Sequence, residues 1–89
     1  MKTVWKFPIE PADHFTLEMP ADAEILDIQV QHREVQLWAL VNPKAKLERR
    51  VFRLAGTGHP IEEGDELRYV ASFQLHNGDL VFHVFEVTP

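Results

Sequence analysis

The sequence contains no cysteine, and this absence excludes several classes of protein. Without thiols the chain can form no disulfide, no zinc–thiolate site and no cysteine nucleophile. No apolar run approaches the roughly 20 residues that a membrane-spanning helix requires. The first residues also lack the apolar core and cleavage site of a secretory signal, so we expect a cytoplasmic location and no membrane partner.

Helical patterning is also missing. No segment of about ten or more residues combines 3.6-residue apolar periodicity with capping residues. Short segments instead alternate apolar and polar residues, and breaks rich in Pro, Gly, Asn and Asp separate them at intervals of about 8–12 residues. We therefore predict one all-β domain over residues 1–89 with little or no helix. The expected architecture is a small antiparallel β-sandwich or partly open barrel of about seven strands.

The first two expected strands cover residues 3–9 and 14–19, and we predict that they form a hairpin across the break at residues 11–13. Pro8 lies in the first of them, which indicates an edge strand or a strand end, because proline donates no ladder hydrogen bond.

Residues 24–31 and 34–41 are expected to form a second hairpin about His32 and Arg33. A two-residue turn sorts the side chains cleanly, whereas a slip of one residue would scatter them. His-Arg does not favour the positive φ of such a turn, so a longer loop stays open. The apolar face would oppose Val30 with Val35, Ile28 with Leu37 and Leu26 with Ala39; the other face would oppose Gln29 with Gln36, Asp27 with Trp38 and Ile25 with Leu40.

The last hairpin, residues 67–76 with 79–87, has the strongest signal, since Asn77-Gly78 is the dipeptide most typical of a tight turn. One face would oppose Leu75 with Leu80, Phe73 with Phe82 and Ala71 with Val84; the other would oppose Gln74 with Val81, Ser72 with His83, Val70 with Phe85 and Arg68 with Val87. The second face is too apolar for open water. We expect a second sheet of this chain or another subunit to cover it.

The formal net charge is −5, which argues against general nucleic-acid binding. Five of the nine basic residues nevertheless gather just before a Gly-rich turn at residues 56–59. Glycines let backbone N–H groups approach a ligand, and arginine suits bidentate contact with phosphate or carboxylate. The expected anion-binding residues are Arg49, Arg50, Arg53, Thr57, Gly58 and His59, with Trp38 as a wall. A structural turn beside a solvated basic strand face is the alternative.

No catalytic or metal-binding constellation stands out. Ser72 and His83 lack an orienting acid at a recognisable spacing, so we interpret them as a cross-strand hydrogen bond. The five histidines show none of the spacings typical of metal ligands. We expect no catalytic residue, no metal and no cofactor.

Four blocks of sequence resemble a family of small uncharacterised proteins of tailed bacteriophages and prophages. The blocks are Met1–Phe7, Leu37–Val41, Gly56–Ile61 and Leu80–Glu86. The resemblance spans nearly the whole chain and implies a phage accessory protein acting in the bacterial cytoplasm or in the virion. It implies no activity and no site residue.

These observations lead to two hypotheses. The first is a non-enzymatic, homo-oligomeric protein that binds a small anionic ligand, such as a nucleotide signal of host antiviral defence. The second is a protein–protein interaction or virion structural module without a small-molecule ligand. A ligand screen separates the two hypotheses.

Overall fold

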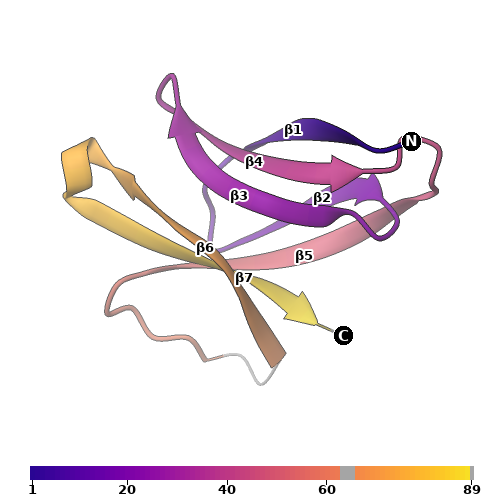
Figure 1. The fold of residues 1–89 in the computed structure, drawn as a ribbon. Helices are drawn as coiled ribbons and strands as arrows, with labels where there is room; N and C mark the ends of the chain where they lie inside the picture. The colour runs from indigo at the N-terminus through magenta and orange to yellow at the C-terminus, as the bar shows by residue number, and fades with distance from the viewer. Residues whose placement is uncertain (63–65, 89) are drawn as a thin grey trace.

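The computed structural model describes residues 1–62 and 66–88 (Figure 1). These residues contain no α-helix, and one short 3-10 turn, η1 (His76–Gly78), joins the last two strands. The prediction of an all-β fold with seven strands is confirmed. The strands are β1 (Thr3–Ile9), β2 (His14–Pro20), β3 (Glu24–Gln31), β4 (Glu34–Val41), β5 (Leu47–Gly56), β6 (Glu66–Leu75) and β7 (Leu80–Thr88).

The strands form two antiparallel sheets that face each other without closing into a barrel (Figure 1). Sheet A has the order β1-β4-β3, and sheet B has the order β2-β5-β7-β6. Strand β3 of sheet A lies against β6 of sheet B. Of the two architectures expected from the sequence, the sandwich is therefore the one observed.

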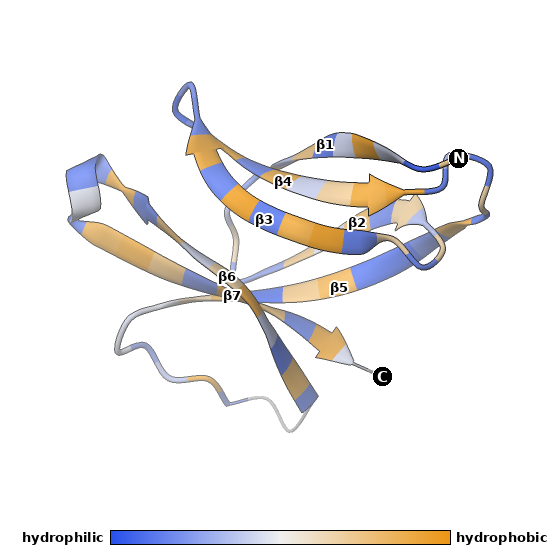
Figure 2. Cartoon of the chain, viewed as in Figure 1, coloured by the Kyte–Doolittle hydropathy of each residue, from blue (hydrophilic) through white to orange (hydrophobic). Residues whose placement is uncertain are grey.

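The core lies between the two inner sheet faces and follows from the alternation along each strand (Figure 2). From sheet A, Leu37, Ala39 and Val41 of β4 are completely buried, and from sheet B, Phe52 and Val84 are completely buried. Phe52 stacks on Phe15 of β2 with ring centroids 5.0 Å apart, and Phe73 packs on Phe82 across the β6–β7 hairpin at 5.6 Å.

The two later hairpins are confirmed, with local corrections where a strand contains a β-bulge. The pairs nearest each turn occur as predicted, from Val30–Val35 to Asp27–Trp38 in one hairpin and from Leu75–Leu80 to Ala71–Val84 in the other. A bulge between Ile25 and Asp27 and another between Tyr69 and Ala71 shift the register beyond these points. The four pairs predicted beyond the bulges are wrong, and those observed are Ile25–Ala39, Glu24–Leu40, Tyr69–Phe85 and Leu67–Val87.

The predicted pairing of the first two strands is wrong. β1 pairs with β4 in sheet A, with Thr3 opposite Val41 and Ile9 opposite Val35, whereas β2 pairs with β5 in sheet B. Residues 10–13 therefore cross between the sheets. Pro8 lies on an edge strand, as its missing N–H requires.

Both hairpin turns adopt left-handed backbone conformations, at Asn77, which tolerates them, and at three residues that adopt them less readily. His32 and Arg33 have φ of 52° and 68°, and Gln31 pairs with Glu34, so the loop is the tight two-residue form and not a longer one. In the β6–β7 turn, His76 and Asn77 have φ of 51° and 56°. This conformation costs about 1–3 kcal/mol at a residue such as His32, Arg33 or His76.

The outer face of the β6–β7 hairpin is covered in part by the segment that follows β5. The Thr57 N–H donates to the Val81 carbonyl at 3.2 Å. The side chains of Val81, His83, Phe85 and Val87 are all partly buried. The cover expected for this face therefore comes at least in part from a loop of the same chain, while Tyr69 is still 58% exposed.

Candidate functional site

The arginines predicted to form one anion clamp lie on opposite faces of β5. Arg50 shares the inner face with Phe52, whereas Arg49 is exposed on the outer face, where Glu18 of β2 lies opposite it. Alternation along a strand makes this separation unavoidable. The structure therefore does not bring Arg49 and Arg50 together around one ligand.

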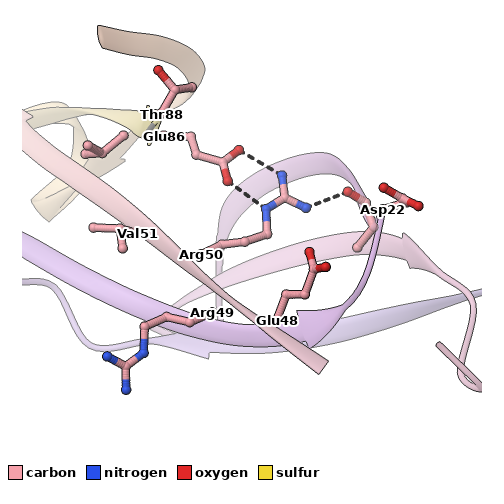
Figure 3. Close-up of a pocket in the computed structure, with 9 residues that line it drawn as sticks. Asp22, Glu48, Arg49, Arg50, Val51, Glu86 and Thr88 are labelled. Carbon is pink, nitrogen blue, oxygen red and sulfur yellow. Dashed lines mark hydrogen bonds and ion pairs between the residues drawn. The ribbon is translucent and has the colours of Figure 1, made fainter. Parts of the chain in front are cut away.

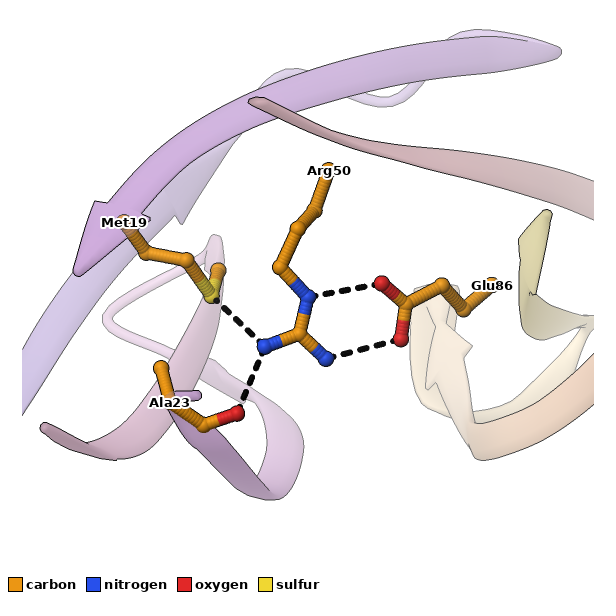
Figure 4. Close-up of polar contacts among 4 residues, drawn as sticks. All are labelled: Met19, Ala23, Arg50 and Glu86. Carbon is orange, nitrogen blue, oxygen red and sulfur yellow. Dashed lines mark hydrogen bonds and ion pairs between the residues drawn. The ribbon is translucent and has the colours of Figure 1, made fainter. Parts of the chain in front are cut away.

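Arg50 is already engaged within the chain (Figure 4). Its Nε and Nη2 donate to the two carboxylate oxygens of Glu86 at 2.6 and 2.8 Å, and Nη1 donates to the Ala23 carbonyl at 2.6 Å and to the Met19 sulfur at 3.4 Å. The two charged side chains are only 18% and 14% exposed. The hydrogen bond to Glu86 raises the pKa of Arg50 above its usual range, against the opposing effect of burial.

A cavity of about 640 Å³ adjoins this ion pair (Figure 3). Its lining carries three carboxylates, those of Asp22, Glu48 and Glu86, and two guanidinium groups. Arg49 turns its guanidinium away from the ion pair (Figure 3). An anion would have to displace Glu86 from Arg50 and lie among carboxylates, so this cavity does not suit one.

Arg53 lies on the outer face of β5 but is only 8% exposed. Its guanidinium donates to the carbonyl oxygens of Asp13 and Pro60, each at 3.3 Å, and to that of Leu54. These contacts tie the segment after β5 to the β1–β2 crossover. Arg53 therefore holds two connecting segments in place.

Thr57 takes part in a chain of exposed hydrogen bonds across sheet B. Thr57 Oγ1 lies 2.8 Å from His83 Nε2, Ser72 Oγ lies 2.8 Å from His83 Nδ1, and Tyr69 Oη lies 2.9 Å from Ser72 Oγ. The predicted cross-strand hydrogen bond between Ser72 and His83 is confirmed. Thr57 thus contacts strand β7 and stabilises the turn.

The other turn residues fit a compact loop. Gly58 has a φ of 86°, which favours glycine, and the His59 N–H donates to the Gly56 carbonyl at 3.0 Å. The His59 ring lies over Gly56, where an added Cβ would come within 2.8 Å of Nδ1. His59 and Thr57 line a cavity of about 280 Å³, and Asp79 is also part of its lining.

Trp38 lies far from this turn in the fold. It points outward from sheet A, opposite Lys6 and Asp27, whereas the Gly-rich turn belongs to sheet B. It therefore forms no wall of a site at residues 56–59. The seven predicted site residues are distributed over both sheets and three faces.

A different region has the geometry of a ligand site: the cleft between the β3–β4 turn and the β6–β7 turn, called here the hairpin-tip cleft. The two turns lie at the same end of the sandwich (Figure 1). Two cavities occupy the cleft, of about 710 and 500 Å³, and Arg33 and Leu75 line both. The larger is lined by Val30, Arg33, Gln74, Leu75, His76, Asn77 and Gly78, and the smaller adds Pro8, Ile9, Glu10, Pro11, Glu34 and Val35.

The larger cavity differs from the other three cavities described here in that no carboxylate lines it. Within residues 1–62 and 66–88, Arg33 makes no hydrogen bond or ion pair. Four of the five non-glycine residues with positive φ, namely His32, Arg33, His76 and Asn77, form the two turns that border the cleft. Strained backbone of this kind is concentrated at functional sites.

One feature of the sequence, the residues of the β3–β4 turn, indicates this cleft, although the basic residues near β5 are the more prominent feature. The hairpin register places His32 and Arg33 in a two-residue turn, although neither residue favours the conformation. A residue that occupies a position where Asn or Gly would be less strained is a candidate for function. Nothing in the sequence shows that the second turn lies beside the first, because the two belong to different sheets.

Comparison with known proteins identifies a family but no activity. The family model for a domain of unknown function, DUF7352, matches residues 1–89. The chain belongs to this family. No curated protein and no solved structure matches the chain.

No helix in the described residues is long and apolar enough to span a membrane. Over the same residues, no three His, Asp or Glu side chains gather closely enough to hold a metal ion.

Proposed function

We propose that this DUF7352 protein is a non-enzymatic binding protein that holds a small anionic ligand in the hairpin-tip cleft. The observation that carries the proposal is the Arg33 guanidinium, which lines both cavities and has no partner in the described chain. Arg33 is exposed, and its guanidinium offers free donors in the fork geometry that suits phosphate or carboxylate.

The cleft also accommodates the rest of such a ligand. Its volume lies within the range of about 300–1,000 Å³ typical of small-molecule sites. Val30 and Leu75 offer an apolar surface, while Gln74 and Asn77 carry amides that can both donate and accept hydrogen bonds. A phosphate on Arg33 with a flat, hydrogen-bonding ring over Leu75 matches this arrangement. A nucleotide has both parts, and a nucleotide signal of host defence is the ligand we propose.

The ligand test combines thermal shift with isothermal titration calorimetry. The probes are inorganic phosphate, 3′,5′-cyclic nucleotides and ADP-ribose. Loss of one charge-assisted contact costs about 1.5–3 kcal/mol, so we expect Arg33→Gln to weaken nucleotide binding by about 10- to 150-fold.

Arg49→Gln is the matched control, since Arg49 is exposed on another face and should leave the affinity unchanged. If Arg49→Gln weakened nucleotide binding and Arg33→Gln did not, the ligand site would lie at β5 and not in the hairpin-tip cleft. Failure of the wild-type protein to bind any of these anions at millimolar concentration would refute the proposed function.

Homo-oligomerisation and a bacteriophage context stay predictions. Self-association would remove exposed apolar side chains from water, such as those of Tyr69 at 58%, Leu47 at 56% and Val4 at 50% exposure. Light scattering measures the oligomeric state directly. A monomer at all concentrations would contradict self-association without affecting the ligand site.

The same exposed apolar residues favour the second hypothesis, an interaction or virion module. A stoichiometric protein partner recovered from bacterial lysate, together with no binding of the anionic probes, would support that hypothesis.

A further inference from the structure

The outer face of sheet A carries a row of polar side chains around one indole. The strand register places Trp38 between Lys6 and Asp27, and places Gln36 between Pro8 and Gln29 in the next row. Side chains directly opposite in antiparallel strands share a face, so these six lie on the side of the sheet away from the core. The inner side is filled by Leu37 and its neighbours.

Gln36 is the anomaly on this face. It is only 5% exposed although it points away from the core, and its Nε2 donates to Glu34 Oε2 at 3.3 Å. Its Oε1 is buried and accepts no hydrogen bond from any residue in the described part of the chain. Buried side-chain oxygens almost always have a donor, so an unpartnered one requires an explanation.

A weak bridge crosses the sheet at the level of Gln36. Lys6 Nζ donates to Gln31 Oε1 at 3.4 Å and so connects β1 to β3 across β4. Because Lys6 lies opposite Trp38 and Gln31 lies opposite Glu34, the line between them crosses β4 at Gln36. Both bridging side chains are exposed and their hydrogen bond is long, so a ligand can replace it at little cost.

Beside the bridge lies an ordered acceptor group. Asp27 Oδ2 accepts from Gln29 Nε2 at 2.7 Å, and Asp27 Oδ1 accepts from the Ile28 N–H at 2.8 Å. The bulge between Ile25 and Asp27 sets the register that brings this carboxylate opposite Trp38. Carboxylate and amide groups are thus held at the edge of a half-buried indole.

We propose that the outer face of sheet A binds a neutral saccharide, with one ring on Trp38 and a hydroxyl group donating to Gln36 Oε1. A sugar ring has an apolar C–H face that packs on an indole, and its hydroxyls both donate and accept hydrogen bonds. Asp27 accepts a second hydroxyl, and Lys6 donates to a third after leaving Gln31. With Glu34 and Asp27 against Lys6, the face is acidic and does not favour a phosphate.

The test is an NMR titration of the ¹⁵N-labelled wild-type protein. The probes are glucose, galactose, N-acetylglucosamine and their disaccharides. We expect the side-chain amide signals of Gln36, Gln29 and Gln31 and the indole N–H of Trp38 to shift together. If none of these signals moves at tens of millimolar of any sugar, the proposal is overturned.

Gln36→Leu separates a binding role from a structural one. Removing an unpartnered buried oxygen should leave the melting temperature unchanged or raise it, while saccharide affinity falls at least tenfold. Arg49→Gln, at an exposed position on the outer face of sheet B, should alter neither saccharide affinity nor stability. A lower melting temperature for Gln36→Leu, or unchanged sugar affinity, would overturn the proposal.

This site is independent of the hairpin-tip cleft. Arg33→Gln should leave saccharide binding intact, and Gln36→Leu should leave nucleotide binding intact. The two proposals therefore fail separately.

Discussion

Glu86→Met should destabilise the protein far more than the loss of one surface charge pair. Glu86 is 14% exposed and accepts two hydrogen bonds from Arg50, and Met has a similar length but no acceptor. Removing one partner of a fully buried ion pair costs about 3–5 kcal/mol, and an exposed pair is worth at most about 1 kcal/mol. With this partial exposure we expect a loss of about 2–4 kcal/mol. In a chain of 89 residues, this lowers the melting temperature by about 10–25 °C.

Urea unfolding followed by tryptophan fluorescence measures this change. The double variant Arg50→Met with Glu86→Met leaves no buried charge, so we expect its stability to lie within about 1 kcal/mol of wild type. Arg49→Met, next in sequence but exposed, should change stability by less than about 0.5 kcal/mol.

The double variant also supplies the decisive comparison, because the coupling between two residues is the departure from additivity. If the loss of unfolding free energy in the double variant equals the sum of the losses in the two single variants, the ion pair does not act as a unit. The assignment of Arg50 to a structural role would then be wrong, and Arg50 would again be a candidate for ligand binding.

Three further predictions concern the turns and the ion pair. The double variant His32→Asn with Arg33→Gly relieves the backbone strain of two left-handed residues. It should raise the free energy of unfolding by about 1–2 kcal/mol in thermal unfolding and abolish nucleotide binding. Unchanged stability would argue against strain in this turn. Gly78→Ala places a Cβ on a residue with a φ of 94°, at 3.2 Å from Gln74 Oε1. The variant should lower the free energy of unfolding by about 1–2 kcal/mol in a urea titration. A neutral result would contradict the turn geometry. The hydrogen bond to Glu86 raises the pKa of Arg50, so Arg50 stays charged and its stabilising effect is lost only when the pH rises through that raised pKa. The coupling with Glu86 should therefore be equal at about pH 7 and about pH 10, and a decline would mean that Arg50 loses its proton earlier.

The parts of the fold that the sequence predicts are those that depend on nearby residues. The β6–β7 hairpin follows from Asn77-Gly78 and the alternation on either side, and the β3–β4 hairpin follows from the only register that groups its apolar residues. The bulges near Leu26 and Val70 could not be predicted, because one extra residue leaves the local composition unchanged.

The partner of β1 could not be predicted either. Its alternating pattern fits any strand with an apolar face, and the choice of β4 over the adjacent β2 depends on which two sheets form. Connections usually join neighbouring strands, so the crossover at residues 10–13 contradicts the default expectation.

The sequence predicts which face of β5 each arginine occupies, but it does not predict the residues that these arginines contact. Alternation already places Arg50 with Phe52 and Arg49 on the opposite face, which makes a single clamp from both unrealistic. The pairing of Arg50 with Glu86 joins residues 36 apart in the chain and has no sequence signature. Basic residues that are close in sequence therefore do not form one basic patch on the surface. Arg33, which lies outside that cluster, has no partner in the described part of the chain.

The central claim is that the ligand site lies between the two hairpin turns, and chemical-shift mapping tests it most directly. With ¹⁵N-labelled protein titrated with ADP-ribose, we predict that the largest backbone shifts fall in residues 30–34 and 74–78. Shifts confined to residues 49–59 would contradict this location and place the ligand at the basic strand instead.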